Sequence, residues 1–152
     1  MAEGRVVPTH QVLVTVENLD PACAWLTSFL ETALLRAVWY PTTVATNSYE
    51  SKKIILEFLE RTGDPAGIDF KLHDFGFRGV SSLESAGLGG AAHLVNFMGT
   101  DTVEALVGAR RLYGADMAGF SIPAMEHSTV TSWGRDGEAA AFGNMMDKYA
   151  RP

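Results

Sequence analysis

Short apolar segments alternate with capped helical segments along the second half of the sequence, and this alternation restricts the possible folds more than any other feature. Strands are expected over residues 68–75, 94–98 and 118–122. Helices are expected after them, opened by a capping box at Ser81–Glu84, over residues 102–113 and over residues 136–149. Strand–helix alternation with buried apolar strands is typical of parallel βαβ units. The sequence therefore predicts an α/β fold.

Three βα units are too few to close a barrel, which takes about eight strands. They also make a poor open sheet, because both faces of a parallel sheet must be covered. We therefore expect residues 67–152 to be the first three βα units of an incomplete TIM-like (β/α) barrel. Residues 1–66 are expected to form an adjoining α+β subdomain. Its elements would be a strand over residues 10–17 with alternating valines, a helix from Asp20 to a stop at Tyr40-Pro41, and a helix from Asn47 to Gly63.

Charge and cysteine content exclude several classes of protein. The 152 residues carry 12 Lys and Arg against 18 Asp and Glu, a net charge of −6, so nucleic-acid binding is not expected. The most apolar stretch, residues 22–40, is interrupted by Glu31 and Arg36, so a membrane span is not expected. The single cysteine, Cys23, is expected to be a buried structural thiol. One cysteine and no secretory signal pattern favour a cytoplasmic location.

Ligand sites of parallel α/β folds lie at the carboxyl ends of the strands, and each expected strand is followed by chemically capable residues. Period two places Lys71, His73 and Phe75 on one face of the first strand. Asp101 follows the second strand, and His127 lies in the loop after the third. Each has a structural alternative: a solvated strand end for His73, a helix N-cap for Asp101 and a plain loop histidine for His127. The recurrence at three strand ends favours a functional site.

The Gly-rich segment at residues 87–92 matches a relaxed dinucleotide-binding pattern, but it precedes a strand instead of following one. Its glycines are expected to permit close helix–sheet packing. His73 and Asp74 would point to opposite sides of a strand, and no metal site is expected. The sequence contains no Walker loop, zinc-protease motif or nucleophile elbow.

Several long segments resemble a known family. They are residues 39–48 (WYPTTVATNS), 71–82 (KLHDFGFRGVSS), 93–97 (HLVNF), 99–102 (GTDT) and 126–129 (EHST). In this order they closely resemble the nicotinamide phosphoribosyltransferases, and the similarity extends from about Gly4 to Tyr149. The more distant nicotinate phosphoribosyltransferases share the fold.

The resemblance implies a reaction in which nicotinamide and phosphoribosyl pyrophosphate give nicotinamide mononucleotide and pyrophosphate, a salvage step toward NAD. It implies Mg2+ bound with phosphoribosyl pyrophosphate, and ATP as an ancillary phosphoryl donor. It also implies a barrel of the type II phosphoribosyltransferase kind, and a dimer in which the partner supplies a tyrosine to the pyridine ring.

The resemblance also implies roles for individual residues. Phe75 would stack on the pyridine ring, a sensible clamp for an electron-poor ring, and Arg78 would lie by the ring and the nucleotide. Asp101 would accept from the carboxamide NH2. His127 would be phosphorylated by ATP and is the expected catalytic residue. The remaining expected substrate-binding residues are Ser121 and Ile122, which would line the nicotinamide tunnel, and His73.

Members of this family are much longer chains. In the family, later barrel strands hold most contacts to phosphoribosyl pyrophosphate and Mg2+, and an N-terminal part supplies the tyrosine. The expected form is therefore a homodimer or an assembly with a complementing chain, not a stable monomer. Two alternatives stay open: a truncated, non-catalytic pyridine-binding or assembly module, and a nicotinate-using phosphoribosyltransferase.

Overall fold

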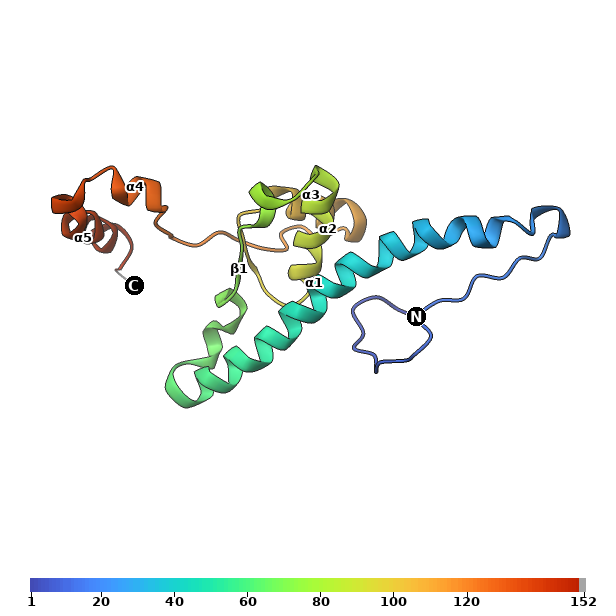
Figure 1. The fold of residues 1–152 in the computed structure, drawn as a ribbon. Coiled ribbons are helices and arrows are strands. Elements are labelled where there is room, and N and C mark those ends of the chain that lie inside the picture. Colours follow the sequence, from blue (N-terminus) through green and yellow to red (C-terminus); the bar gives the residue numbers. More distant parts are fainter. Residues whose placement is uncertain (151–152) are drawn as a thin grey trace. The chain divides into compact units, whose positions relative to one another are not determined.

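The computed structural model describes residues 1–150 (Figure 1). Contacts divide the chain into two compact units, Met1–Phe120 and the residues from Ser121 onward. With η denoting a 3-10 helix, the first unit contains η1 (Pro21–Cys23), α1 (Leu26–Thr62), η2 (Pro65–Phe70), β1 (His73–Asp74), η3 (Gly76–Gly79), α2 (Leu83–His93), β2 (Gly99–Thr100) and α3 (Val103–Tyr113). The second contains α4 (His127–Thr131), η4 (Arg135–Gly137) and α5 (Glu138–Tyr149). The expected division of the chain between residues 66 and 67 stays a prediction.

One helix, α1, replaces the two helices that the sequence predicts on either side of Pro41. It runs for 37 residues through this proline, so the predicted stop is wrong. A proline inside a helix removes a backbone hydrogen bond and costs about 3 kcal/mol. The helix nevertheless continues because tertiary contacts hold the segment that follows. Asn96 Nδ2 donates to Ala45 O at 2.9 Å, and Ser48 is buried at 4% exposure.

The N-terminal residues before η1 differ from the sequence prediction. Residues 10–17 form no strand, and their alternating valines are exposed. Alternation predicts a strand only where a second strand can pair with it, and no strand of the described residues pairs with this segment. Cys23, expected to be buried, is half-buried in η1.

Two short strands form a parallel sheet, which confirms the mixed helix and sheet character and the parallel pairing. His73 pairs with Gly99 and Asp74 with Thr100. A parallel bridge joins Gly99 to Phe120. The strands are shorter than predicted and shifted along the chain. Most of residues 68–75 belong to η2 and the turn after it, residues 94–98 form turns after α2, and residues 118–122 contribute only the bridge.

The apolar run after α2 shows why the second strand begins late. The N–H groups of Asn96 and Phe97 both bond back to His93 O, at 3.0 and 3.1 Å, so the chain keeps turning instead of extending. Phe97 is 1% exposed and anchors this turn in the core. The strand therefore starts at Gly99, once Phe97 is buried.

Helices α2 and α3 follow their sequence signals closely. Ser82 caps α2 by accepting from the Ser85 N–H at 3.1 Å, one residue later than the predicted capping box. Helix α3 ends at Gly114 as predicted, where φ is +67° and the glycine N–H bonds back to the last turn. In the second unit, α5 confirms the predicted C-terminal helix, whereas α4 lies where the sequence predicts a loop.

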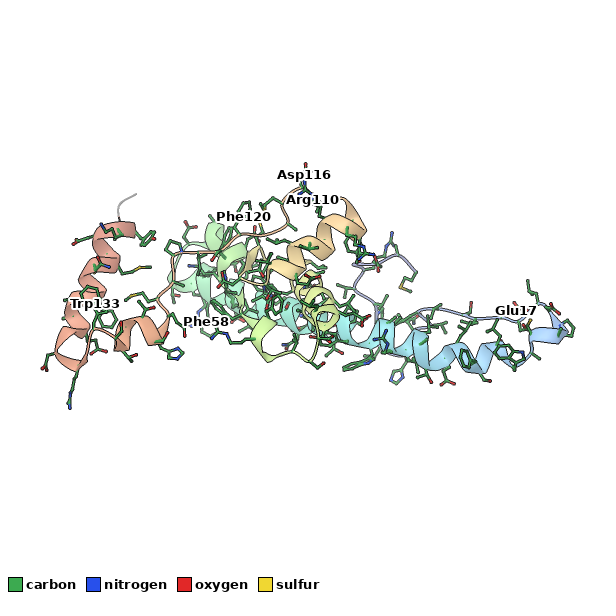
Figure 2. All side chains as sticks on the ribbon, turned by 90° about the horizontal axis from the view of Figure 1, so that it is seen from above. Glu17, Phe58, Arg110, Asp116, Phe120 and Trp133 are labelled. Carbon is green, nitrogen blue, oxygen red and sulfur yellow. The ribbon has the colours of Figure 1, made fainter. Side chains whose placement is uncertain are left out.

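Small side chains dominate the buried core of the described residues. In the first unit its apolar members are Phe97 and four alanines, namely Ala86, Ala92, Ala105 and Ala109; Ala141 is buried in the second unit. Large apolar side chains instead stay exposed, among them Trp39 on α1. Figure 2 labels two others, Phe58 on α1 and Trp133 in the second unit. None of the described helices is both long and apolar enough to cross a membrane.

The glycines of residues 87–92 permit close packing, chiefly between helices and, at Gly90, also against the strand β1. A Cβ on Gly90 would clash with the Ala105 Cβ of α3, and it would lie 3.1 Å from Asp74 Oδ2. A Cβ on Gly89 would lie 2.5 Å from the hydroxyl of Tyr40 on α1. Helices α3 and α1 therefore both pack closely against α2 at its glycines.

Replacing Gly90 by alanine is expected to lower the free energy of unfolding by about 1–3 kcal/mol, because the new methyl group has no space against α3. Gly108→Ala is the matched control in the same helix pair. There the new Cβ would lie 3.7 Å from Gly87 O, an ordinary contact. Gly108→Ala should therefore be neutral or stabilise by about 0.5–1 kcal/mol. Urea unfolding measures both, and equal effects would contradict the close-packing argument.

Candidate functional site

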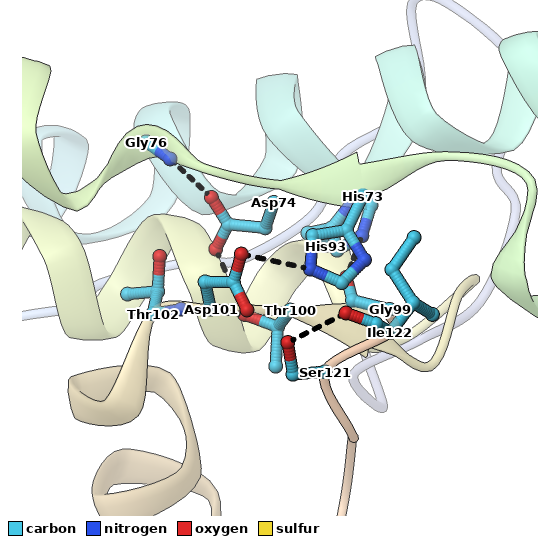
Figure 3. Close-up of polar contacts among 10 residues, drawn as sticks. All are labelled: His73, Asp74, Gly76, His93, Gly99, Thr100, Asp101, Thr102, Ser121 and Ile122. Atoms are coloured by element: carbon cyan, nitrogen blue, oxygen red, sulfur yellow. Dashed lines mark hydrogen bonds and ion pairs between the residues drawn. The ribbon is translucent and has the colours of Figure 1, made fainter. Parts of the chain in front are cut away.

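The carboxyl ends of β1 and β2 lie side by side and bring two predicted site residues together (Figure 3). The Asp101 N–H donates to Asp74 O at 2.9 Å, which continues the strand pairing by one residue. The Asp101 carboxylate then faces back toward β1, and its Oδ2 lies 3.3 Å from His73 Nε2. Parallel pairing thus joins residues 28 positions apart in the sequence (101 − 73).

A cavity of about 390 Å³ lies beside this pair and is lined by Phe75, Phe77, Arg78, Asp101 and Thr102. Three of these residues, Phe75, Arg78 and Asp101, are among the predicted substrate-binding residues. Phe75 and Phe77 are 51% and 39% exposed, so aromatic surface is available to a ligand. Aromatic surface, a guanidinium and a carboxylate at one opening suit a flat polar ring with a hydrogen-bond donor.

The position of Asp101 bears on whether it serves as a helix cap. The N-cap residue of α3 is Thr102, not Asp101. The Thr102 N–H is itself satisfied, because it donates to Thr100 Oγ1 at 3.0 Å. The carboxylate of Asp101 therefore stands one residue before the N-cap, near His73.

His73 is an unusual buried histidine. Its side chain is 6% exposed, and neither ring nitrogen makes an aligned hydrogen bond within the described part of the chain. Its ring lies 4.5 Å from the Phe75 ring, centroid to centroid, at an interplanar angle of 37°. A buried polar atom without a partner costs about 1–3 kcal/mol, so such atoms are often found where a ligand binds. Lys71, predicted to share this face, is exposed.

A second cavity, of about 400 Å³, lies between β1 and the helices α1 and α2. Helices α1 and α2 and the segment from Leu72 to Phe77 line it, and its polar members include Ser48, His73, Asp74 and His93. Asp74 Oδ1 accepts from the Gly76 N–H at 2.7 Å, and its Oδ2 accepts from the Thr100 hydroxyl at 3.4 Å. Asp74 therefore fixes the turn after β1.

The sequence gives little indication of one buried pair in this cavity. Ser48 Oγ on α1 lies 3.3 Å from His93 Nδ1, and His93 Nε2 lies 3.1 Å from Gly99 O. Burial lowers the pKa of His93, although the hydrogen bond to Gly99 opposes this effect. The signal that could have identified His93 is a polar residue ending an Ala- and Gly-rich helix. Nothing in the sequence marks Ser48.

The remaining predicted residues lie in the second unit. Ser121 Oγ donates to Ile122 O at 3.4 Å. His127 begins α4, its side chain is 84% exposed, and its Nδ1 lies 2.7 Å from Glu126 Oε1. Their grouping with Phe75 and Asp101 stays a prediction. Within residues 1–150, no cluster of three or more His, Cys, Asp or Glu could hold a metal ion.

Comparison with known proteins gives one family. The model of the nicotinate phosphoribosyltransferase (NAPRTase) family matches residues 70–151. The chain is 62% identical over 152 residues to a nicotinamide phosphoribosyltransferase of Xanthomonas campestris pv. campestris (strain 8004). This alignment covers 99% of the chain and 32% of that protein. Proteins of the same name from Acinetobacter baylyi and Mycoplasma pneumoniae are each 32% identical, over 96% and 97% of the chain and 29% and 31% of their own lengths. The chain thus spans about a third of these relatives.

Lowering the pH is expected to destabilise the first unit through His93. Because burial places its folded-state pKa below the ordinary 6.5, the unfolded imidazole binds a proton that the folded one does not. This contribution to stability is complete above pH 6.5 and is lost as the pH falls through 6.5 toward the folded-state pKa. Urea unfolding between about pH 5 and 8 measures it. His93→Gln, which does not titrate, should show a shallower pH dependence of the free energy of unfolding. Identical pH dependences of the variant and the unaltered chain would show that His93 is not the group responsible.

Proposed function

The chain belongs to the nicotinate phosphoribosyltransferase family, and on that premise we propose that it supplies the pyridine-binding part of a nicotinamide phosphoribosyltransferase. The reaction joins nicotinamide to phosphoribosyl pyrophosphate, giving nicotinamide mononucleotide and pyrophosphate for NAD salvage. The observation that carries the proposal is the cavity in which Phe75, Arg78 and Asp101 meet. Each of these residues offers a contact that a pyridine carboxamide can use.

Within this proposal, the pyridine ring lies against Phe75, and Arg78 attracts the ribose phosphate of the nucleotide. The carboxamide NH2 donates to Asp101. His73, whose Nε2 lies 3.3 Å from Asp101 Oδ2, is proposed to supply a further polar contact next to this carboxylate. Ser121 and Ile122 complete the tunnel in the assembled enzyme.

The carboxylate of Asp101 also favours nicotinamide over nicotinate. A carboxylate accepts from an amide NH2 but repels a ligand carboxylate, and such repulsion in a desolvated site costs several kcal/mol. The three relatives described above are all named nicotinamide phosphoribosyltransferases. A nicotinate-using enzyme would place a cation or a neutral donor where Asp101 stands.

His127 is proposed to accept a phosphoryl group from ATP, with ADP as the leaving group. Its exposure makes it accessible to a phosphoryl donor, and the Glu126 carboxylate at Nδ1 favours a proton there. The Nε2 lone pair is then the nucleophile. Mg2+ is proposed to enter with phosphoribosyl pyrophosphate.

We further propose that the parallel strands open a TIM-like barrel, with residues 1–66 in an adjoining subdomain. The enzyme is proposed to work in the cytoplasm as a homodimer or with a complementing chain. Exposed Trp39 and Phe58 and the small alanine-rich core support an assembly, since large exposed apolar faces are commonly covered by a partner. Light scattering that gives a stable monomer at micromolar concentration would contradict this part.

Formation of nicotinamide mononucleotide tests the function directly. The purified chain, alone and with a complementing chain, is given nicotinamide and phosphoribosyl pyrophosphate, with and without ATP. Product in either setting supports the enzyme. Nicotinamide binding without product in both settings would favour the non-catalytic module.

Replacing Asp101 by Asn should shift the preference for nicotinamide over nicotinate by at least about tenfold. The reason is that a hydrogen bond to a charged group contributes about 1.5–3 kcal/mol and the repulsion of nicotinate is removed. Calorimetric titration with both ligands measures the ratio. Asp116→Asn is the matched control, because it removes the same charge from an exposed residue of the same unit. Unchanged binding of both ligands by Asp101→Asn would show that Asp101 does not select the amide.

A further inference from the structure

Ser48 is the one buried residue of α1. Its hydroxyl reaches His93 at the last position of α2, and His93 in turn reaches Gly99 O at the start of β2. A chain of side-chain contacts therefore leads from the long helix to the strand that carries Asp101. Such a chain can serve stability alone, or it can fix the geometry of the strand end.

Donor and acceptor roles in this chain follow from elementary chemistry. A carbonyl oxygen only accepts, so His93 Nε2 must carry a proton and donate to Gly99 O. Nδ1 of the neutral ring then has a free lone pair and accepts from the Ser48 hydroxyl. Burial, which lowers the pKa of His93, keeps the ring neutral. The imidazole is thus held in one tautomer and one orientation.

The Gly99 peptide is coupled to Asp101 by two routes. The first is the backbone: the Thr100 N–H donates to Phe120 O at 2.9 Å, and the Asp101 N–H donates to Asp74 O at 2.9 Å. The second is packing, because a Cβ on Gly99 would lie only 2.7 Å from His73 Nδ1. A shift of the Gly99 peptide would therefore move the His73 ring, whose Nε2 lies 3.3 Å from Asp101 Oδ2.

We propose that Ser48 and His93 are positioning residues that hold the Gly99 peptide, and through it the Asp101 carboxylate and the His73 ring, in the geometry that receives the pyridine amide. This inference rests on the proposed function. It assigns no contact between ligand and either residue. Their effect would be on the placement of Asp101, which a role in stability alone would leave unchanged.

Lys52 provides a matched control, because it ties α1 to the segments next to the same strands without touching Gly99. Its ammonium donates to Asp69 Oδ1 at 2.7 Å and to Asn96 O at 2.5 Å. Lys52→Met should destabilise the unit while leaving the Gly99 peptide in place. Comparing this variant with a His93 variant of similar stability therefore separates an effect on the position of Asp101 from a general loss of stability.

The experiment uses the 152-residue chain with the variants Ser48→Ala, His93→Leu, His93→Gln and Lys52→Met. The first readout needs no ligand: NMR signals of the Asp101 carboxyl carbon and the His73 ring nitrogens. The second is calorimetric titration with nicotinamide and nicotinate. His93→Leu should shift the Asp101 and His73 signals and weaken nicotinamide roughly tenfold, the scale set by leaving a buried acceptor unsatisfied. His93→Gln, which can still donate to Gly99 O, should restore part of both.

Unshifted Asp101 and His73 signals in His93→Leu would overturn the proposal, as would equal shifts in Lys52→Met. If His93→Leu does not fold, Ser48→Ala decides on the same signals, because it removes only the contact with α1. If the unaltered chain binds neither ligand, the proposed function fails for this chain. The signals of Asp101 and His73 still decide whether His93 positions them.

Discussion

The parallel pairing of β1 with β2 is the constraint on which the rest of the first unit depends. Only two residues of each strand pair, yet the pairing sets His73 and Asp101 within 3.3 Å of each other. In parallel strands both carboxyl ends face the same edge, so the segments that leave them emerge together. The cavity lined by Phe75, Arg78 and Asp101 is built from those two departing segments. Without the pairing, the same residues would be distant in space as they are in sequence.

Such a short pairing needs support from the helices, and small residues make that support possible. Gly90 allows α2 to approach both Ala105 of α3 and the Asp74 side chain of β1. Such a close approach leaves little freedom for α2 to move relative to α3 or to Asp74 of β1. The cost is a core of small volume, because alanines bury little apolar surface compared with leucine or phenylalanine. Exposed aromatic residues on α1 are consistent with further burial in a larger assembly.

Local signals predicted those parts of the fold that local interactions determine. The end of α3 at Gly114, the helix α5 and the parallel arrangement were all predictable, because caps, periodicity and strand–helix alternation act over a few residues. The continuation of α1 through Pro41 was not predictable, because it depends on contacts with residues about fifty positions away, such as Asn96 with Ala45. The valines of residues 10–17 alternate as a strand would, but no described strand pairs with them.

The residues of the candidate site can also be divided into those that local sequence signals predict and those that depend on contacts between distant segments. The residues expected at the carboxyl ends of the first two strands do meet, since the rule that finds them needs only strand order. Ser48 and His93 were missed because they are 45 residues apart and meet only after α1 packs on α2. Asp101 shows a different limit: its position before a helix suits a cap or a ligand contact equally well in the sequence. Only the structure shows that Thr102 is the N-cap residue.

Two histidines near β1 illustrate how a site can be fixed on one side and left open on the other. His93 has a hydrogen-bond partner at each ring nitrogen, so its orientation and tautomer are determined. The side chain of His73 is 6% exposed, and it has no aligned partner at either nitrogen among the described residues. Unsatisfied buried nitrogens are unfavourable in the free protein, and a ligand that supplies a partner recovers that free energy on binding. The satisfied histidine therefore belongs to the scaffold, whereas the ring nitrogens of His73, beside Asp101, still lack an aligned partner among the described residues.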